Sequence, residues 1–309
     1  MHAFLMNGEH ERSFGAQVLR APAGAAALDG WILVTDEWLH CVHVFAGRGR
    51  WLGRFGSFGR GPGLFNAPSG IAAADGLVYV CDTKNHCIQV LSLTIDSAAA
   101  AAAAARNGAG DPGPSDGAAR AVVVRVIGGG LGVRPGQLDH PTCVAVGPGG
   151  EVAVTEQRNA RAQVFAADGS VTRILKAVNW GLDAAGRPVR HADASGMVLE
   201  LGVPTGVAYC GRTGRLFVAD GFYHRVVVFD AAGHAVQKFA AGSGWGVVPP
   251  WQEPFRGWRQ AKLPIGQERW APQGGGGTCE LDVPASIACA ASGHIVVCNR
   301  GNRQVGIFI

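Results

Sequence analysis

Short apolar runs bounded by turn residues recur along this chain, and apolar residues at helical spacing are hard to find. The runs are rich in Val, Ile and Leu, and Gly, Pro, Asp and Asn separate them, which is typical of many short β-strands. The chain has 47 glycines and 16 prolines, in agreement with frequent turns. The pattern therefore predicts an all-β fold.

One layout of strands and turns repeats. In residues 68–91 a Pro-x-Gly opening leads into a strand, a turn, a second strand that ends at Asp82, the pair Asn85-His86 and a third strand. A repeat of this length indicates a repeat architecture in which each copy is one structural unit. The same layout recurs in residues 28–45, where it is weaker, and in residues 141–165, 204–229 and 284–308.

The turns after the second strands carry acidic and amide side chains. Such side chains bond nearby backbone N–H groups and thereby tighten a turn. We therefore expect a structural role at these positions. The predicted turn residues are Asp36, Asp82, Asn85, Glu156, Asn159, Asp220, Asn299 and Asn302.

A fourth strand follows the third in several copies, at residues 49–56, 121–129 and 234–239. Four antiparallel strands per unit, repeated radially, form a β-propeller. The chain ends on a third strand, and its first residues read as the end of a third strand plus a fourth. We expect the N-terminal strand to complete the last blade, which would remove open sheet edges and close five or six four-stranded blades.

Two segments carry a family resemblance: DTKNHCIQVL at residues 82–91 and DGFYHRVVVF at residues 220–229. Together with the glycine-rich lead-in at residues 55–72, they resemble the NHL repeat family, which implies a β-propeller that commonly has six blades. The chain departs from the family pattern at Cys41 and Cys87, where Arg is usual, as at residues 161 and 225. Asn299 departs in the same way, because Asp is usual there.

Three of the intervals between successive turns exceed the about 40 to 45 residues that a four-stranded blade needs. We therefore predict a single propeller over residues 1–309 with inserts at about 97–120, 177–201 and 241–282. The first insert is a low-complexity Ala/Gly segment, expected to be a solvated excursion without a role. The other two are expected on the face that carries the turns, and such inserts often mark a binding face.

The third insert is aromatic and basic. Its side chains either fold over a channel mouth as a plug or contact a partner. Trp and Arg are the usual anchors of protein interfaces, and the same residues can stack on single-stranded bases. The candidate binding residues are Trp245, Trp251, Arg256, Trp258, Arg259, Lys262, Arg269 and Trp270.

Net charge, hydropathy and cysteine usage bear on the partner's charge, on membrane association and on the redox compartment. The formal net charge of +4 permits an anionic partner without requiring one. No run approaches the roughly 18 apolar residues of a membrane span, and the first residues hold no cationic leader. The eight cysteines form no CxxC pair, so a reducing compartment is simpler, with a Cys81–Cys87 disulfide as the open alternative. We expect a cytoplasmic monomer that does not bind membranes.

The sequence offers few candidates for catalytic or metal-binding residues. His40, His86 and His224 share one repeat position, but equivalent positions on separate blades lie too far apart to hold one ion. We interpret them as turn-stabilising residues. The first strands of the copies contain no Asp, Glu or His, and the GxSxG, HExxH and P-loop motifs are absent. His140 is a weak metal candidate, and no cofactor is predicted.

These observations favour a non-catalytic scaffold that binds a protein or peptide. Two alternatives stay open. Resemblance to TRIM-NHL proteins implies RNA binding, although this chain lacks their RING, B-box and coiled coil. Resemblance to peptidyl-amidoglycolate lyases or to propeller lactonases implies a metal-dependent enzyme with a channel site.

Overall fold

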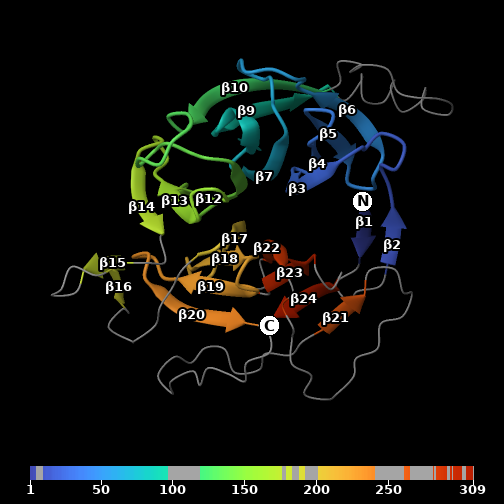
Figure 1. The fold of residues 1–309 in the computed structure, drawn as a ribbon. Helices are drawn as coiled ribbons and strands as arrows, with labels where there is room; N and C mark the ends of the chain where they lie inside the picture. Colours follow the sequence, from blue (N-terminus) through green and yellow to red (C-terminus); the bar gives the residue numbers. More distant parts are fainter. Residues whose placement is uncertain are drawn as a thin grey trace. The chain divides into compact units, whose positions relative to one another are not determined.

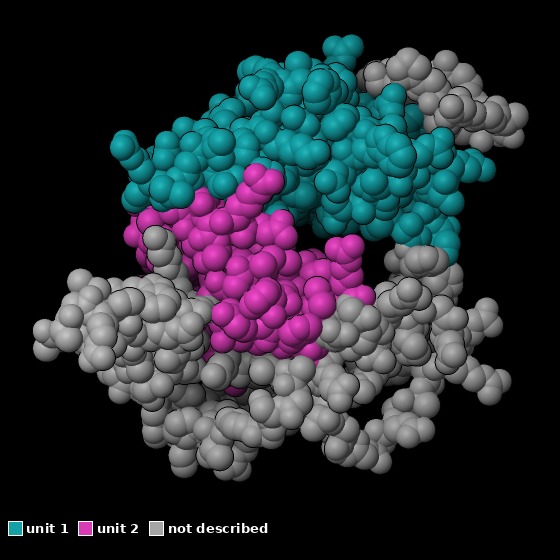
Figure 2. Space-filling view, viewed as in Figure 1, with its two compact units in different colours: residues 1–146, 168–170 teal, residues 147–167, 171–309 magenta. Residues whose placement is uncertain are grey.

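The computed structural model describes residues 1–4, 10–96, 119–175, 179–182, 188–191, 201–240, 261–264, 281, 283–290, 293, 295–300 and 304–308. Apart from the 3-10 turn η1 (Thr83–Asn85), its named elements are β-strands, which confirms the predicted all-β class. The chain divides into two compact units. Unit 1 comprises residues 1–146 and 168–170, and unit 2 comprises residues 147–167 and 171–309 (Figure 2).

Four sheets consist of four strands that follow one another in the sequence, and in each sheet the strands lie in sequence order (Figure 1). This meander is the blade of a β-propeller. The blades are β3 (Pro22–Leu28), β4 (Trp31–Asp36), β5 (Cys41–Ala46) and β6 (Trp51–Phe55); β7 (Pro68–Ala74), β8 (Leu77–Asp82), β9 (Cys87–Ile95) and β10 (Ala119–Ile127); β11 (Pro141–Val146), β12 (Val152–Glu156), β13 (Arg161–Phe165) and β14 (Val171–Leu175); and β17 (Pro204–Tyr209), β18 (Leu216–Asp220), β19 (Arg225–Phe229) and β20 (Ala235–Ala240).

The last repeat forms a sheet of a different kind. Strands β22 (Pro284–Cys289), β23 (Ile295–Asn299) and β24 (Gln304–Phe308) are consecutive, but the outer strand next to β24 is β21 (Ala261–Pro264), which precedes them in the sequence. The described residues therefore contain four blades of consecutive strands and this fifth four-stranded sheet, where the sequence predicted five or six four-stranded blades.

The predicted closure by the N-terminal strand was wrong. Strand β21 already hydrogen-bonds with β24, so the edge that the N-terminal strand was expected to cover is occupied. The N-terminal residues instead form a hairpin of β1 (His2–Phe4) and β2 (His10–Ser13), which satisfy each other's backbone groups. Phe14, which follows the hairpin, packs edge-on against Phe45 of β5, with ring centroids 5.2 Å apart.

The middle strands of the blades are apolar because side chains on both of their faces are buried. In unit 1, the β3–β6 and β7–β10 blades share one hydrophobic cluster. Residues on strands β4, β5, β8 and β12 are almost all buried, which explains their continuous Val, Leu and Ile runs. The side chains that form the centre of the cluster are Leu33, Val42, Val44, Leu52, Phe65, Val78, Val80 and Leu91.

A glycine permits the close approach of the first strands of two blades in unit 1. A Cβ atom added to Gly70 of β7 would lie 2.6 Å from the Thr142 carbonyl oxygen and 2.6 Å from the Cys143 Cα of β11. These are backbone atoms, which cannot swing away. Glycine is therefore required by the packing of strand on strand.

The three predicted inserts lie partly among the described residues. The second contains the two-stranded sheet of β15 (Asn179–Leu182) and β16 (Pro188–His191), and the third contributes β21. Residues 119–120 of the first insert belong to β10, and residues 97–118 lie outside the described residues.

The described cysteines, among them Cys81 and Cys87, form no disulfide. Cys81 pairs with Ile88 across the β8–β9 hairpin, whereas Cys87 pairs with Asp82, so the two thiols are not direct cross-strand neighbours. The disulfide alternative was therefore wrong. Within the described part of the chain, no helix is long and apolar enough to cross a membrane.

Candidate functional site

The repeated acids occupy the turns between second and third strands, and the first of them organises its turn through backbone N–H groups. Asp36 is fully buried, and its carboxylate accepts hydrogen bonds from the N–H groups of Trp38 and Leu39 at 3.1 and 2.9 Å. The Asp36 carboxylate also accepts hydrogen bonds from the backbone N–H groups of Arg20 and Ala21, which precede β3. One carboxylate thus joins the turn to the start of its own blade.

Asp82 fulfils the same role with different partners. It accepts from the backbone N–H of Asn66 at 2.7 Å, from the Asn85 amide at 2.8 Å and from the Gln89 amide at 2.9 Å. Burial raises the pKa of the Asp82 carboxyl above its usual value, and these hydrogen bonds oppose that rise. The Asn85 amide also donates to the backbone carbonyl oxygen of Gly59 at 2.7 Å, whereas the sequence predicted that it accepts from backbone N–H groups.

The other two acids use arginine. Arg161 donates to Glu156 with a distance of 2.5 Å from Nε to Oε1, and both side chains are buried. Asn159 also donates to Glu156, at 2.6 Å. Arg225 lies 3.1 Å from Asp220. Where the chain has Cys41 and Cys87 at the arginine position, backbone N–H and amide donors replace the cation, which accounts for that departure from the NHL pattern.

Three histidines follow these turns and accept a hydrogen bond from the next sheet. His40, His86 and His224 adopt positive φ values of 54°, 59° and 49°. The Nδ1 atom of each accepts the backbone N–H of the residue before the next opening proline. The pairs are His40 with Ala67 at 3.0 Å, His86 with His140 at 3.3 Å and His224 with Val283 at 3.0 Å. We call His40, His86 and His224 the latch histidines.

The repeat of residues 141–165 has no histidine at this position. Ala160 occupies the position, also with positive φ, and its methyl group cannot accept a hydrogen bond. The N–H of Val203, before the next opening proline, donates instead to Asp220 of its own blade at 3.2 Å. The latch histidines therefore connect consecutive sheets and support the interpretation of this position as structural.

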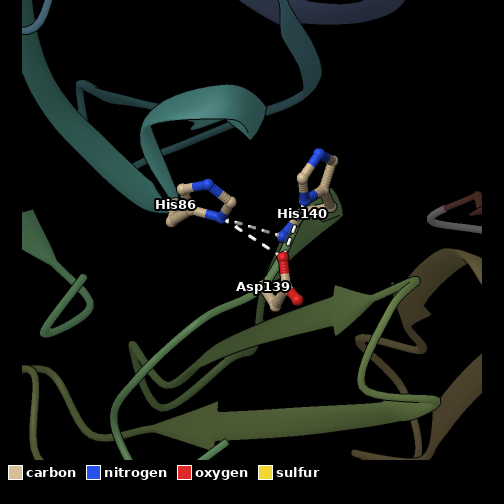
Figure 3. Close-up of side chains that lie close together, drawn as sticks. All are labelled: His86, Asp139 and His140. Atoms are coloured by element: carbon tan, nitrogen blue, oxygen red, sulfur yellow. Dashed lines mark hydrogen bonds and ion pairs between the residues drawn. The ribbon is translucent and has the colours of Figure 1, made fainter. Parts of the chain in front are cut away.

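The latch histidine His86 has two further potential metal ligands beside it. Asp139 and His140 lie beside His86, and Figure 3 shows the three side chains directed toward one another. The Asp139 Oδ1 atom lies 2.7 Å from the His140 Nδ1 atom and 3.4 Å from the His86 Nδ1 atom. The two rings meet edge-on with centroids 4.9 Å apart. Their side chains are 17 to 20% exposed, so solvent reaches them.

The three residues come from elements of unit 1. His86 follows η1 directly, and Asp139-His140 ends the loop before β11. The sequence singled out His140 alone and missed its neighbours. The available indication was the alignment of residues 56–68 with 129–141, in which Asn66-Ala67 corresponds to Asp139-His140.

Exposed apolar side chains occur on the turns and loops of the same unit. Trp38, in the turn after Asp36, is 75% exposed, and Phe58, in the loop between β6 and β7, is 67% exposed. Phe58 lies beside His40, with ring centroids 5.0 Å apart. In the corresponding loop before β11, Leu131 and Val133 are 60% and 72% exposed. We call Trp38, Phe58, Leu131 and Val133 the loop-face residues. No pattern in the sequence had indicated them as candidates.

The candidate binding residues of the third insert, Trp245 to Trp270, lie outside the described residues, except that the backbone of Lys262 belongs to β21. Asn299 ends β23, and Asn302 lies outside the described part of the chain. The first strands of the blades carry small apolar and hydroxyl residues, as the sequence of β7, PSGIAAA, illustrates. Candidate channel acids or histidines are therefore not contributed by β7, β11, β17 or β22.

The four-stranded meanders define this chain as a β-propeller. Residues 65–91, which include β7, β8 and the turn with Asp82 and His86, match the model of the NHL repeat. This segment of the chain is therefore an NHL repeat, and it forms part of one of the four-stranded blades.

Three solved structures are similar to this chain at low sequence identity. A protein of unknown function from Bacteroides caccae is 12% identical with a TM-score of 0.50, over 94% of this chain and 75% of that chain. The PQQ-bound aldose sugar dehydrogenase from Streptomyces coelicolor is 18% identical with a TM-score of 0.46, over 94% and 78%. Streptogramin B lyase is 11% identical with a TM-score of 0.39, over 94% and 93%.

The similarity to the Bacteroides caccae protein concerns the fold alone, and the activities in the other two names belong to those proteins. No curated protein sequence matches this chain.

Proposed function

We propose that this propeller is a non-catalytic binding protein whose loop-face residues contact a peptide segment of a partner protein. The observation that carries the proposal is the exposure of Trp38, Phe58, Leu131 and Val133, which lie in the turn and loops that border the latch histidines of unit 1. Large aromatic side chains are costly to leave in water and are the commonest anchors of protein interfaces. Loops on a rigid scaffold are also the usual site of binding.

Charge indicates the chemistry of the peptide. Arg60 and Arg134 are exposed in the two loops that hold Phe58, Leu131 and Val133, and Lys84 is exposed at the turn position that corresponds to Trp38. A ligand that combines apolar and acidic side chains would complement this surface. The Trp/Arg-rich third insert has the same residue types and is part of the same proposal.

The test uses a displayed library of random peptides and the immobilised full-length protein. We expect enrichment of peptides with acidic and apolar residues. The double variant Trp38→Ala/Phe58→Ala should weaken their binding by roughly 30-fold for each anchor removed, because each anchor typically contributes about 2 kcal/mol. The matched control is Val122→Ser/Val124→Ser on the edge strand β10, whose valines are also exposed.

Two results would overturn the proposal. One is an absence of enriched peptides, or equal binding by the wild type and the Trp38→Ala/Phe58→Ala variant. The other is binding of single-stranded RNA, with steep dependence on salt, in place of peptides. That outcome would favour the RNA-binding alternative.

A further inference from the structure

The second latch differs from the others in the residues that surround it. The loops before β7 and before β11 have the same form, each with a parallel bridge, Phe58 to Phe65 and Leu131 to Leu138. In the first loop the residues next to the opening proline are Asn66 and Ala67, which place no carboxylate or imidazole beside His40. In the second they are Asp139 and His140, and both reach His86. Substitution at two adjacent positions has added two potential metal ligands to an existing structural turn.

The three side chains of this cluster are already linked by polar contacts. His86 Nδ1 accepts the backbone N–H of His140. Asp139 Oδ1 forms a hydrogen bond with His140 Nδ1 and lies 3.4 Å from His86 Nδ1. Nitrogen and carboxylate oxygen are both electron-pair donors, so a divalent cation placed between them would attract both. The His86 bond is also the longest of the three latch bonds, 3.3 Å against 3.0 Å.

The separations match those of metal ligands. Zn²⁺ binds imidazole nitrogen and carboxylate oxygen at about 2.0 to 2.2 Å, so two ligands of a tetrahedral ion lie roughly 3.4 Å apart. The distance from Asp139 Oδ1 to His86 Nδ1 already has this value. The distance from Asp139 Oδ1 to His140 Nδ1 is 2.7 Å and would lengthen when the hydrogen bond is replaced by two bonds to the ion. The ligand atoms of all three side chains lie within 4.8 Å of one another.

We propose that His86, Asp139 and His140 form a binding site for a divalent transition-metal ion such as Zn²⁺. Two imidazoles and one carboxylate suit Zn²⁺ and its neighbours, whereas Ca²⁺ and Mg²⁺ prefer oxygen ligands throughout. The partial exposure of the three side chains leaves a fourth position for water. The ion would join the turn after β8 to the loop before β11, in place of the hydrogen bond that the other latches use. This site is independent of the loop-face peptide contact.

The experiment measures Zn²⁺ binding to the full-length protein after removal of metal with a chelator. We expect the wild type to bind one equivalent more than the His140→Ala variant, by equilibrium dialysis and elemental analysis. Asp139→Asn, which keeps the shape of the side chain, should weaken that equivalent by at least about tenfold, since even residues that only support a metal ligand matter by this factor. Co²⁺ in place of Zn²⁺ should give a visible absorption spectrum that both variants lose.

His40→Ala is the matched control. It removes a latch hydrogen bond of the same kind from the neighbouring junction, where Asn66 and Ala67 stand at the positions of Asp139 and His140. It should retain the full Zn²⁺ stoichiometry and the Co²⁺ spectrum, and thermal melts would establish that all three variants fold. Equal Zn²⁺ binding by the wild type, His140→Ala and Asp139→Asn would overturn the proposal, as would loss of binding in His40→Ala to the same degree.

Discussion

Burial of one histidine predicts a specific loss of stability in acid. His43 on β5 is 1% exposed and accepts a hydrogen bond from the Trp51 indole N–H at 3.1 Å. Burial lowers the pKa of His43 from 6.5 to about 4, against the opposing attraction of Asp36. Because the unfolded chain binds the proton between these two values and the folded protein does not, stability falls as the pH drops through this window.

The magnitude follows from the size of the pKa change. A shift of one pKa unit corresponds to about 1.36 kcal/mol, so the full penalty is about 3 kcal/mol below pH 4. Between pH 7 and pH 5 the loss should be about 2 kcal/mol. The variant His43→Gln should remove it, because Gln89 and Gln163 occupy the equivalent positions and donate their amides to the local acid.

The assay is urea-induced unfolding of the wild type and His43→Gln at a series of pH values. The difference in unfolding free energy between the two proteins should change by about 2 kcal/mol from pH 7 to pH 5, in favour of the variant at the lower pH. His234→Gln is the control, because the His234 side chain is 79% exposed and should give no such change. A difference that stays constant over this range would refute the reasoning, as would an NMR titration in which His43 protonates near pH 6.5.

Two further predictions concern stability. Arg161→Cys, which places at this turn the residue found at Cys41 and Cys87, should destabilise the protein by about 3 kcal/mol or more because it leaves the buried Glu156 without its cation. The exposed Arg158→Ala should change little, and an equally mild effect of Arg161→Cys in thermal denaturation would contradict this account. Gly70→Ala should lower the free energy of unfolding by about 1 to 3 kcal/mol, because the added Cβ collides with the β11 backbone. Gly211→Ala is the control, because a Cβ atom there meets open space. Equal unfolding midpoints for these two variants would contradict the prediction.

The NHL repeat was recognisable from the sequence because its determinants are local. The alternation of apolar strands with turns, the acid that ends each second strand and the proline that opens each first strand all lie within one blade. The four blades of consecutive strands follow directly from these patterns. Asp36 could be assigned to its turn in this way, because the N–H groups of Trp38 and Leu39 are two and three residues away.

The pairing of the last sheet depended on tertiary structure. Two segments were able to cover the edge of β24, the N-terminal strand and a short apolar segment within the third insert. Strand order at an edge is set by which backbone reaches it, and no local pattern distinguishes the two candidates. The structure places β21 there.

The cluster at the second latch also required the fold. His86 and His140 are 54 residues apart in the sequence, and each by itself is an ordinary histidine beside a turn. Whether they meet depends on the packing of β7 against β11, which Gly70 permits, and on the positive φ of both residues. The sequence by itself determined the blades, because their hydrogen bonds and alternation are short-range. Only the tertiary structure decided which side chains of different blades meet, because that depends on how the sheets pack.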